Sequence, residues 1–150
     1  MHKILFICHG NICRSTMAEF VMKEQVRKAG LDVHVESAAL HTDELGNDTY
    51  PGTKEVLTKY GIPFTPRRAR LATKADYAQF DYIIGMDSYN RRDMMRLFGN
   101  DPHEKCSLML EWAGLPGDVA DPWYTGDFET TYADVEAGCI GLLEHLKRSR

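Results

Sequence analysis

A short apolar segment over residues 3–8, followed by a polar loop and an amphipathic segment, limits the fold of this 150-residue chain more than any other feature. The apolar run is typical of a strand buried on both faces in the middle of a parallel sheet. Residues 16–29 carry apolar side chains at steps of three and four and therefore predict a helix, which Gly30 is placed to end. With a second strand predicted over 32–37, these segments form a parallel β-loop-α-β unit.

The rest of the chain continues the alternation of strands and helices. Two further strands are predicted over 81–86 and 105–109. Further helices are predicted over 53–60, 75–79, 88–98 and 131–147, and loops over 38–51 and 114–128. This alternation indicates an α/β fold with a parallel sheet and helices on both of its faces. No repeat, low-complexity tract or linker divides the sequence, so we expect one domain over 1–150.

Composition argues against several classes of protein. A net charge of −4 and a pI of about 5.8 give no support for a nucleic-acid partner, and the arginine-rich segments 67–70 and 90–92 are expected to be mostly solvated surface. No segment resembles a signal peptide or approaches the ~20 apolar residues of a membrane span, so we expect a cytoplasmic protein without a membrane partner. The four cysteines are then expected to be free thiols, and the scattered histidines predict neither a metal site nor a cofactor.

The loop from Cys8 to Ser15 carries the predicted chemistry. It follows the first strand at its carboxyl end, where ligands bind in open parallel sheets. The loop N–H groups and the start of the next helix favour an anion, and the same field stabilises a thiolate at Cys8, which makes it a nucleophile. Arg14 offers a planar pair of donors for two phosphate oxygens, and Ser15 is placed to cap the helix and to hydrogen bond with the Cys8 sulfur. Cys-x5-Arg is by itself a loose pattern, but its position between strand and helix favours a reactive anion site over a buried, inert cysteine.

The sequence resembles the low-molecular-weight protein tyrosine phosphatases in the segment Phe6-Ile7-Cys8-His9-Gly10-Asn11-Ile12-Cys13-Arg14-Ser15. The resemblance extends along the chain to Ser37-Ala38, Ala69-Arg70, the segment 85–90 and Asp121-Pro122-Trp123-Tyr124. We accordingly expect a three-layer α/β/α domain whose four-stranded parallel sheet has the order 2-1-3-4, with the phosphate-binding loop after strand 1.

The same resemblance implies roles for individual residues. Cys8 attacks phosphorus and forms a phosphocysteine, while Arg14 and the loop amides stabilise the transferring phosphoryl group. Asp121 protonates the leaving phenolate and then activates water. The other phosphate- or substrate-binding residues are Asn11, which braces the loop, Trp123 and Tyr124 beside the substrate ring, and His9, Gly10, Ile12, Cys13 and Ser15. The expected partner is a phosphotyrosine-containing protein, bound by a monomer or weak homodimer.

The sequence also departs from the family pattern. Near Asp43 many relatives carry an aromatic residue that forms one wall of the cleft, and here that wall is expected to be acidic. A flat surface for the substrate ring would then come from Tyr50, Trp123 or Tyr124. Arg67 stands where some relatives have a histidine that supports the loop asparagine. For Cys13, the family pattern implies reversible pairing with Cys8 under oxidation, and a plain packing role is an equal alternative.

Three other functions remain open on the sequence. A protein-arginine phosphatase of the same fold shares the loop, although relatives with that activity tend to carry Thr where Ile12 stands. An arsenate reductase needs two further cysteines close together near the loop, and Cys106 and Cys139 do not fit that requirement. A non-catalytic phosphate-binding module would have little use for both Arg14 and Asp121.

Overall fold

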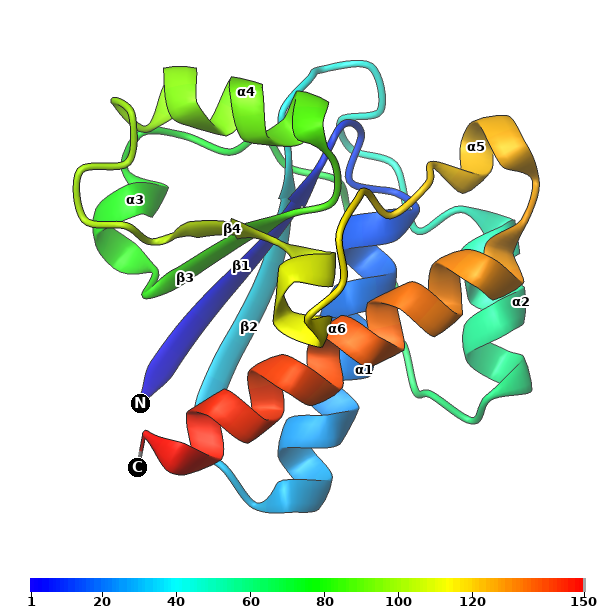
Figure 1. Ribbon diagram of the computed structural model, residues 1–150. Coiled ribbons are helices and arrows are strands. Elements are labelled where there is room, and N and C mark those ends of the chain that lie inside the picture. Colours follow the sequence, from blue (N-terminus) through cyan, green and yellow to red (C-terminus); the bar gives the residue numbers. More distant parts are fainter. Residues whose placement is uncertain (150) are drawn as a thin grey trace.

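The computed structural model describes residues 1–149, which form a four-stranded sheet with helices around it (Figure 1). Its strands are β1 (His2–Cys8), β2 (Val33–Ala39), β3 (Tyr82–Gly85) and β4 (Cys106–Leu108). Their order in the sheet is β2-β1-β3-β4, and each neighbouring pair is parallel. The predicted α/β architecture and the sheet order 2-1-3-4 are therefore confirmed.

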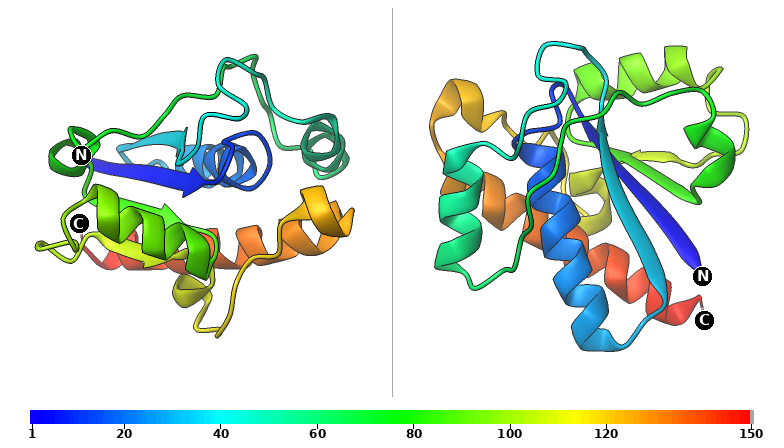
Figure 2. Two further views of the ribbon diagram at one scale, coloured as in Figure 1. Left: turned by 90° about the horizontal axis from the view of Figure 1, so that it is seen from above. Right: turned by 180° about the vertical axis from the view of Figure 1, so that it is seen from behind.

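Helices cover both faces of the sheet. α1 (Arg14–Ala29) and α6 (Phe128–Arg148) lie on one face, with α2 (Pro51–Lys59) beside them, whereas α4 (Ser88–Leu97) and the short α3 (Asp76–Gln79) lie on the other (Figures 1 and 2). The end of α6 and the start of β1 meet at the edge of the sheet opposite the loop that follows β1 (Figure 1). Within residues 1–149, no helix combines the length and the apolar character that crossing a membrane requires.

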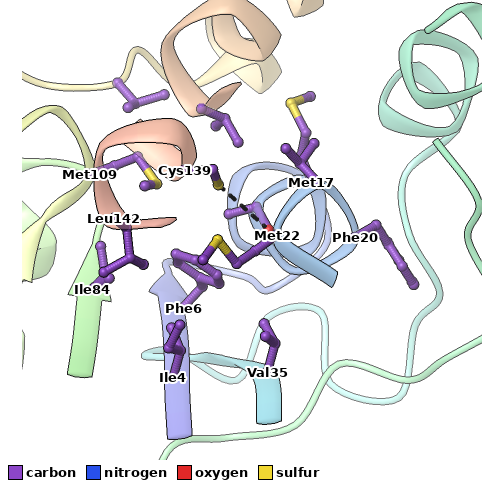
Figure 3. Packing of buried hydrophobic residues seen from close by; sticks show 14 of the residues in the cluster. Ile4, Phe6, Met17, Phe20, Met22, Val35, Ile84, Met109, Cys139 and Leu142 are labelled. Atoms are coloured by element: carbon purple, nitrogen blue, oxygen red, sulfur yellow. Dashed lines mark hydrogen bonds between the residues drawn. The ribbon is translucent and has the colours of Figure 1, made fainter. Parts of the chain in front are cut away.

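The central strand β1 explains why its sequence is continuously apolar. Ile4 and Phe6 point into the core beneath α1 and α6, and Leu5 and Ile7 point into a second core beneath α4. All four side chains are fully buried, and each contributes roughly 1.5–3 kcal/mol relative to an exposed position. Figure 3 shows the first core, where the Cys139 thiol of α6 lies 3.9 Å from the Ala18 carbonyl oxygen of α1.

The sequence misplaced several element boundaries and missed two short elements. β2 continues to Ala39 because that residue pairs in register with Cys8 at the end of β1. The segment 109–113 is a 3₁₀ helix, η1 (Met109–Ala113), so β4 is shorter than predicted. The predicted loop 114–128 contains α5 (Pro122–Thr125), and α6 begins earlier than predicted because Asp127 caps it, its Oδ1 accepting a hydrogen bond from the Thr130 N–H at 3.0 Å.

Candidate active site

The loop between β1 and α1 lies at the carboxyl edge of the sheet and forms the floor of a cleft. β1 ends at Cys8 and α1 begins at Arg14, so the loop itself spans residues 9–13. The cleft has a volume of about 730 Å³, which is the size of a typical small-molecule site. Of the predicted site residues, those that line it are Cys8, His9, Gly10, Ile12, Cys13, Arg14, Asp121, Trp123 and Tyr124.

The Cys8 sulfur is held from behind by a short chain of hydrogen bonds. It lies 3.0 Å from the Ser15 hydroxyl, which in turn accepts a hydrogen bond of 2.8 Å from the Asn11 amide nitrogen. Because the Ser15 oxygen already accepts from Asn11, its own hydrogen is free to point at the sulfur. Both residues are completely buried. The predicted contact between Ser15 and Cys8 is present, but Ser15 does not cap the helix, because α1 already begins at Arg14.

Asn11 is fixed by an arginine from a distant segment. Its backbone has a φ of 60°, a left-handed conformation that a non-glycine residue adopts only when its surroundings hold it there. Arg67 supplies that support, since its Nη1 donates to the Asn11 carbonyl oxygen at 2.7 Å and its Nη2 donates to the Asn11 side-chain oxygen. Burial lowers the pKa of Arg67. The expectation that the 67–70 segment is solvated surface is therefore wrong for Arg67, which is half-buried.

Arg14 is almost fully buried, and its guanidinium group is held by three oxygen atoms. Nη1 donates to Asp87 Oδ2 at 2.7 Å and to the Val119 carbonyl oxygen at 2.9 Å, and Nη2 lies 3.5 Å from Asp121 Oδ2. Burial alone lowers the pKa of Arg14, but the Cys8 sulfur and the two carboxylates outweigh it and raise the pKa above its ordinary value. The guanidinium group is consequently both charged and fixed in orientation.

Asp121 reaches the cleft from the segment just before α5. It caps that helix, because its Oδ1 accepts a hydrogen bond of 3.0 Å from the Trp123 N–H, while Oδ2 faces Arg14. Trp123 and Tyr124 follow it along the rim and are exposed. Tyr50 packs edge-on against the Trp123 ring at 5.1 Å and stacks on Phe128. Tyr50 thus supports the Trp123 ring at the rim of the cleft.

The acidic wall expected near Asp43 is present, and it carries histidines as well. Asp43 lines the cleft and lies 2.8 Å from the His9 ring nitrogen, and this hydrogen bond lowers the pKa of Asp43. His41 and Asp93 form a second pair of the same kind at 3.1 Å and line the same side of the cleft.

Cys13 is the second thiol of the loop. It is buried, and burial raises its pKa to about 12, so it is a neutral thiol near pH 7. Cys139 is buried in the core and Cys106 is half-buried, and all four cysteines are free thiols as predicted. In the part of the chain that the structure describes, no group of three or more His, Cys, Asp or Glu side chains is placed to hold a metal ion.

Sequence reasoning missed several residues that the fold brings to this cleft. Asp87 was not among the predicted site residues, although its position directly after the predicted strand 81–86 was a signal that it faces the ligand edge of the sheet. His41 and Asp93 carried no such signal, because nothing local in the sequence indicates their contact. The contact between Arg14 and the Val119 carbonyl oxygen could not be predicted from the sequence either, since every residue has a backbone carbonyl group.

Comparison with known proteins assigns the chain to a family. The family model described as low molecular weight phosphotyrosine protein phosphatase matches residues 3–150. The low molecular weight protein-tyrosine-phosphatase YfkJ of Bacillus subtilis is 36% identical over 154 residues, covering 100% of this chain and 99% of YfkJ. Its crystal structure is similar with a TM-score of 0.96 at 34% identity, covering 100% of this chain and 97% of that one.

Two further solved structures extend the comparison. The low molecular weight protein tyrosine phosphatase SP-PTP of Streptococcus pyogenes has a TM-score of 0.87 at 41% identity, covering 97% of this chain and 93% of that one. DARP, a Drosophila arginine phosphatase, has a TM-score of 0.88 at 27% identity, covering 96% and 97%. With a family model that spans nearly the whole chain and relatives that match along their full length, the chain belongs to the low-molecular-weight protein-tyrosine-phosphatase family.

Proposed function

We propose that this chain hydrolyses phosphotyrosine in protein substrates, with Cys8 as the nucleophile, Arg14 as the phosphate-binding residue and Asp121 as the general acid and base. The observation that carries the proposal is the convergence of these three side chains, from the end of β1, the start of α1 and the cap of α5, on one cleft. A thiol alone would indicate only a reactive site. A thiol, a fixed guanidinium group and a carboxylate together can supply the nucleophile, the phosphate-binding group and the general acid for hydrolysis of a phosphate ester.

In the first step the Cys8 sulfur attacks phosphorus, the bond from phosphorus to the phenolic oxygen breaks, and a phosphocysteine forms. Both N–H groups of Arg14 Nη1 are occupied by Asp87 and Val119. Nε and the N–H of Nη2 that does not face Asp121 therefore remain to hold two oxygens of the transferring phosphoryl group, as a planar pair of donors can. The Ser15 hydroxyl, 3.0 Å from the sulfur, favours the thiolate before attack and as the leaving group afterwards.

Asp121 serves both halves of the reaction. In its protonated form it gives a proton to the leaving phenolate, and as the carboxylate that results it takes a proton from the water that attacks the phosphocysteine. Release of phosphate restores the Cys8 thiolate and the protonated Asp121, so no other reactant is consumed. The position of Asp121 supports this role, because its Oδ2 lies 3.5 Å from Arg14 Nη2, next to where the phosphate would be held.

Phosphoarginine is the second candidate substrate, because the similar structure of DARP is that of an arginine phosphatase. Two features favour phosphotyrosine. Ile12, a branched apolar side chain, lines the cleft, and the exposed rings of Trp123 and Tyr124 offer flat apolar contact to a phenol. The cleft also holds carboxylates that can pair with a guanidinium group, Asp43 and Asp93 among them, so the two substrates have to be compared directly.

A direct comparison of two peptides tests this proposal. The peptides share one sequence and carry either phosphotyrosine or phosphoarginine, and phosphate release is measured with the purified, reduced protein. We expect a higher kcat/KM for the phosphotyrosine peptide, and no release by Cys8→Ser, which controls for contaminating phosphatases. Faster hydrolysis of the phosphoarginine peptide would reverse the substrate assignment, and hydrolysis of neither would contradict the proposed function.

The setting of the reaction is also part of the proposal. Four free cysteines suit a reducing compartment, which supports a cytoplasmic enzyme acting on phosphotyrosine-containing proteins. We expect it to work as a monomer or weak homodimer, since every group assigned to the reaction comes from one chain.

A further inference from the structure

Two histidine rings are stacked on one wall of the cleft. The centroids of His9 and His41 are 4.1 Å apart and their planes differ by 20°. Both side chains line the cleft, and about half of each is exposed. This histidine pair, His9 and His41, lies on the wall near Asp43 that the sequence predicted to be acidic.

The stack is built into the backbone. Cys8 and Ala39 are the last paired residues of β1 and β2, so the segments that follow the two strands leave the sheet side by side. The Leu40 N–H then donates to the Cys8 carbonyl oxygen at 3.0 Å, and the His41 N–H donates to the His9 carbonyl oxygen at 3.0 Å. These bonds hold the two histidines at the same level, and their rings meet for that reason.

Each ring is also tied to a carboxylate. His9 Nε2 lies 2.8 Å from Asp43 Oδ2, and His41 Nε2 lies 3.1 Å from Asp93 Oδ2 on α4. Arg92 shares the second carboxylate, because its Nε lies 3.6 Å from Asp93 Oδ1. The pair is thus held by Asp43 of the loop after β2 and by Asp93 of α4.

Other charged side chains line the cleft around the pair. Asp118 accepts hydrogen bonds from the Ser88 N–H at 3.2 Å and from the Ser88 hydroxyl at 3.3 Å, at the start of α4. Glu44 lines the same wall, with its carboxylate held by the Asn47 amide at 2.6 Å. On the floor, the charge of Arg14 faces Asp87 and Asp121. The wall therefore has three carboxylates, those of Asp43, Glu44 and Asp93, against the single guanidinium group of Arg92. Two net negative charges remain when both rings are neutral, and protonation of both rings cancels them.

We propose that the histidine pair forms a titratable specificity wall, an inference that rests on the proposed function. The charge of this wall selects substrates by the charge of the residues next to the phosphotyrosine. With neutral rings the wall is negative and favours substrates with Lys or Arg next to the phosphotyrosine. Histidine changes charge between about pH 5 and 8, so the preference weakens as the pH falls.

The test uses two phosphotyrosine peptides that differ only in their flanks, Lys on both sides or Glu on both sides. The ratio of kcat/KM for the Lys peptide to that for the Glu peptide is measured at pH 5.5 and pH 7.5 at constant ionic strength. Ionisation of Cys8, Asp121 and the phosphate affects both peptides alike and largely cancels in the ratio. We expect the ratio to be about three- to tenfold higher at pH 7.5 than at pH 5.5, the scale of one or two exposed charge interactions.

Variants assign the effect to the pair. In His9→Gln and His41→Gln the amide still donates to the carboxylate but cannot ionise, so each variant should lose part of the pH dependence and the double variant nearly all of it. His34→Gln is the matched control, because His34 pairs with Glu36 in the same way outside the cleft, and it should behave as the parent protein. Asp43→Asn provides a second measure, since removing one negative charge should lower the ratio at pH 7.5.

The outcomes separate this inference from the proposed function. A ratio equal at both pH values, or a pH dependence that survives in the double variant, would overturn the specificity wall while leaving the phosphatase assignment intact. If the double variant does not fold, an unchanged ratio in Asp43→Asn at pH 7.5 overturns it equally. Hydrolysis of neither peptide by the parent protein would contradict the proposed function, and with it the inference.

Discussion

Arg14 Nη1 donates a 2.7 Å hydrogen bond to Asp87 Oδ2, which ties the first residue of α1 to the cap of α4 across 73 positions of sequence. The other oxygen of Asp87 accepts a hydrogen bond of 2.7 Å from the Asn90 N–H. One carboxylate therefore both starts a helix and sets the orientation of the guanidinium group. The geometry that we propose for phosphate binding depends in this way on a helix cap.

Asp87→Asn separates these two roles. Asparagine caps a helix about as well as aspartate, so the free energy of unfolding should change by less than about 1 kcal/mol. The charge opposite Arg14 is lost, however, and kcat/KM for para-nitrophenyl phosphate should fall about tenfold, because charge-assisted hydrogen bonds exceed neutral ones by roughly 1 kcal/mol. Asp127→Asn is the matched control, since Asp127 caps α6 without touching Arg14. Equal rates in both variants would contradict the role of Asp87.

Arg67→Ala tests the support of the loop. Removing the guanidinium group takes two hydrogen bonds from Asn11, whose left-handed backbone then loses its brace. We expect a decrease in kcat of about tenfold and a loss of roughly 1–3 kcal/mol in the free energy of unfolding. Arg68→Ala, which changes the exposed neighbour, should leave both quantities nearly unchanged. Similar effects from the two variants would mean that Arg67 acts only as surface charge.

Asp121→Asn tests the proton transfer. Asparagine retains an oxygen that caps α5, so the cleft should keep its shape while the acid is lost. Hydrolysis of phenyl phosphate, which has a poor leaving group, should slow about 10²- to 10⁴-fold, and hydrolysis of an aryl phosphate with a good leaving group should slow far less in the step that forms the phosphocysteine. Single-turnover rates across a series of substituted phenyl phosphates measure the difference. A uniform loss across the series would exclude Asp121 as the general acid.

The buried thiol of Cys139 should make the free energy of unfolding depend on pH in the alkaline range. Complete burial raises the pKa of its thiol far above the ordinary value, so the folded protein keeps the thiol neutral while the unfolded chain ionises it above about pH 8.5. Its contribution to stability is therefore full below that pH and is lost as the pH rises, at about 1.4 kcal/mol per pH unit. Urea unfolding of Cys139→Ala should show a shallower decline above pH 9 than the parent protein, and parallel curves would contradict the prediction.

The parts of this fold that the sequence predicted are those governed by neighbouring residues. The apolar run of β1, the stripe of α1 and the glycine at Gly30 were sufficient for the first parallel unit and for the position of the loop. The helix α5 had a local signal, Asp121 as cap and Pro122 as first residue, but its four residues are too few for a periodic pattern. The η1 segment was missed for the same reason.

The parts that the sequence could not predict depend on contacts between distant segments. Arg67 reads as a solvated arginine until the fold brings it to Asn11. The stacking of His9 on His41 follows from the register in which β1 and β2 pair, and no feature of either residue's neighbours indicates it. Asp43 was correctly expected on the wall of the cleft, but its histidine partner was not foreseen.

The central claim, that Cys8 is the nucleophile, is tested most directly by trapping the intermediate. Asp121→Asn should accumulate it, because the residue that activates water is missing while a substrate with a good leaving group still reacts. The reaction is quenched in acid during turnover, and the protein is digested and analysed by mass spectrometry. One phosphoryl group should appear on the peptide that carries Cys8, and none should appear in the double variant that combines Asp121→Asn with Cys8→Ser. A phosphoryl group on another side chain, or turnover by Cys8→Ser at a rate comparable to that of the parent protein, would contradict the account.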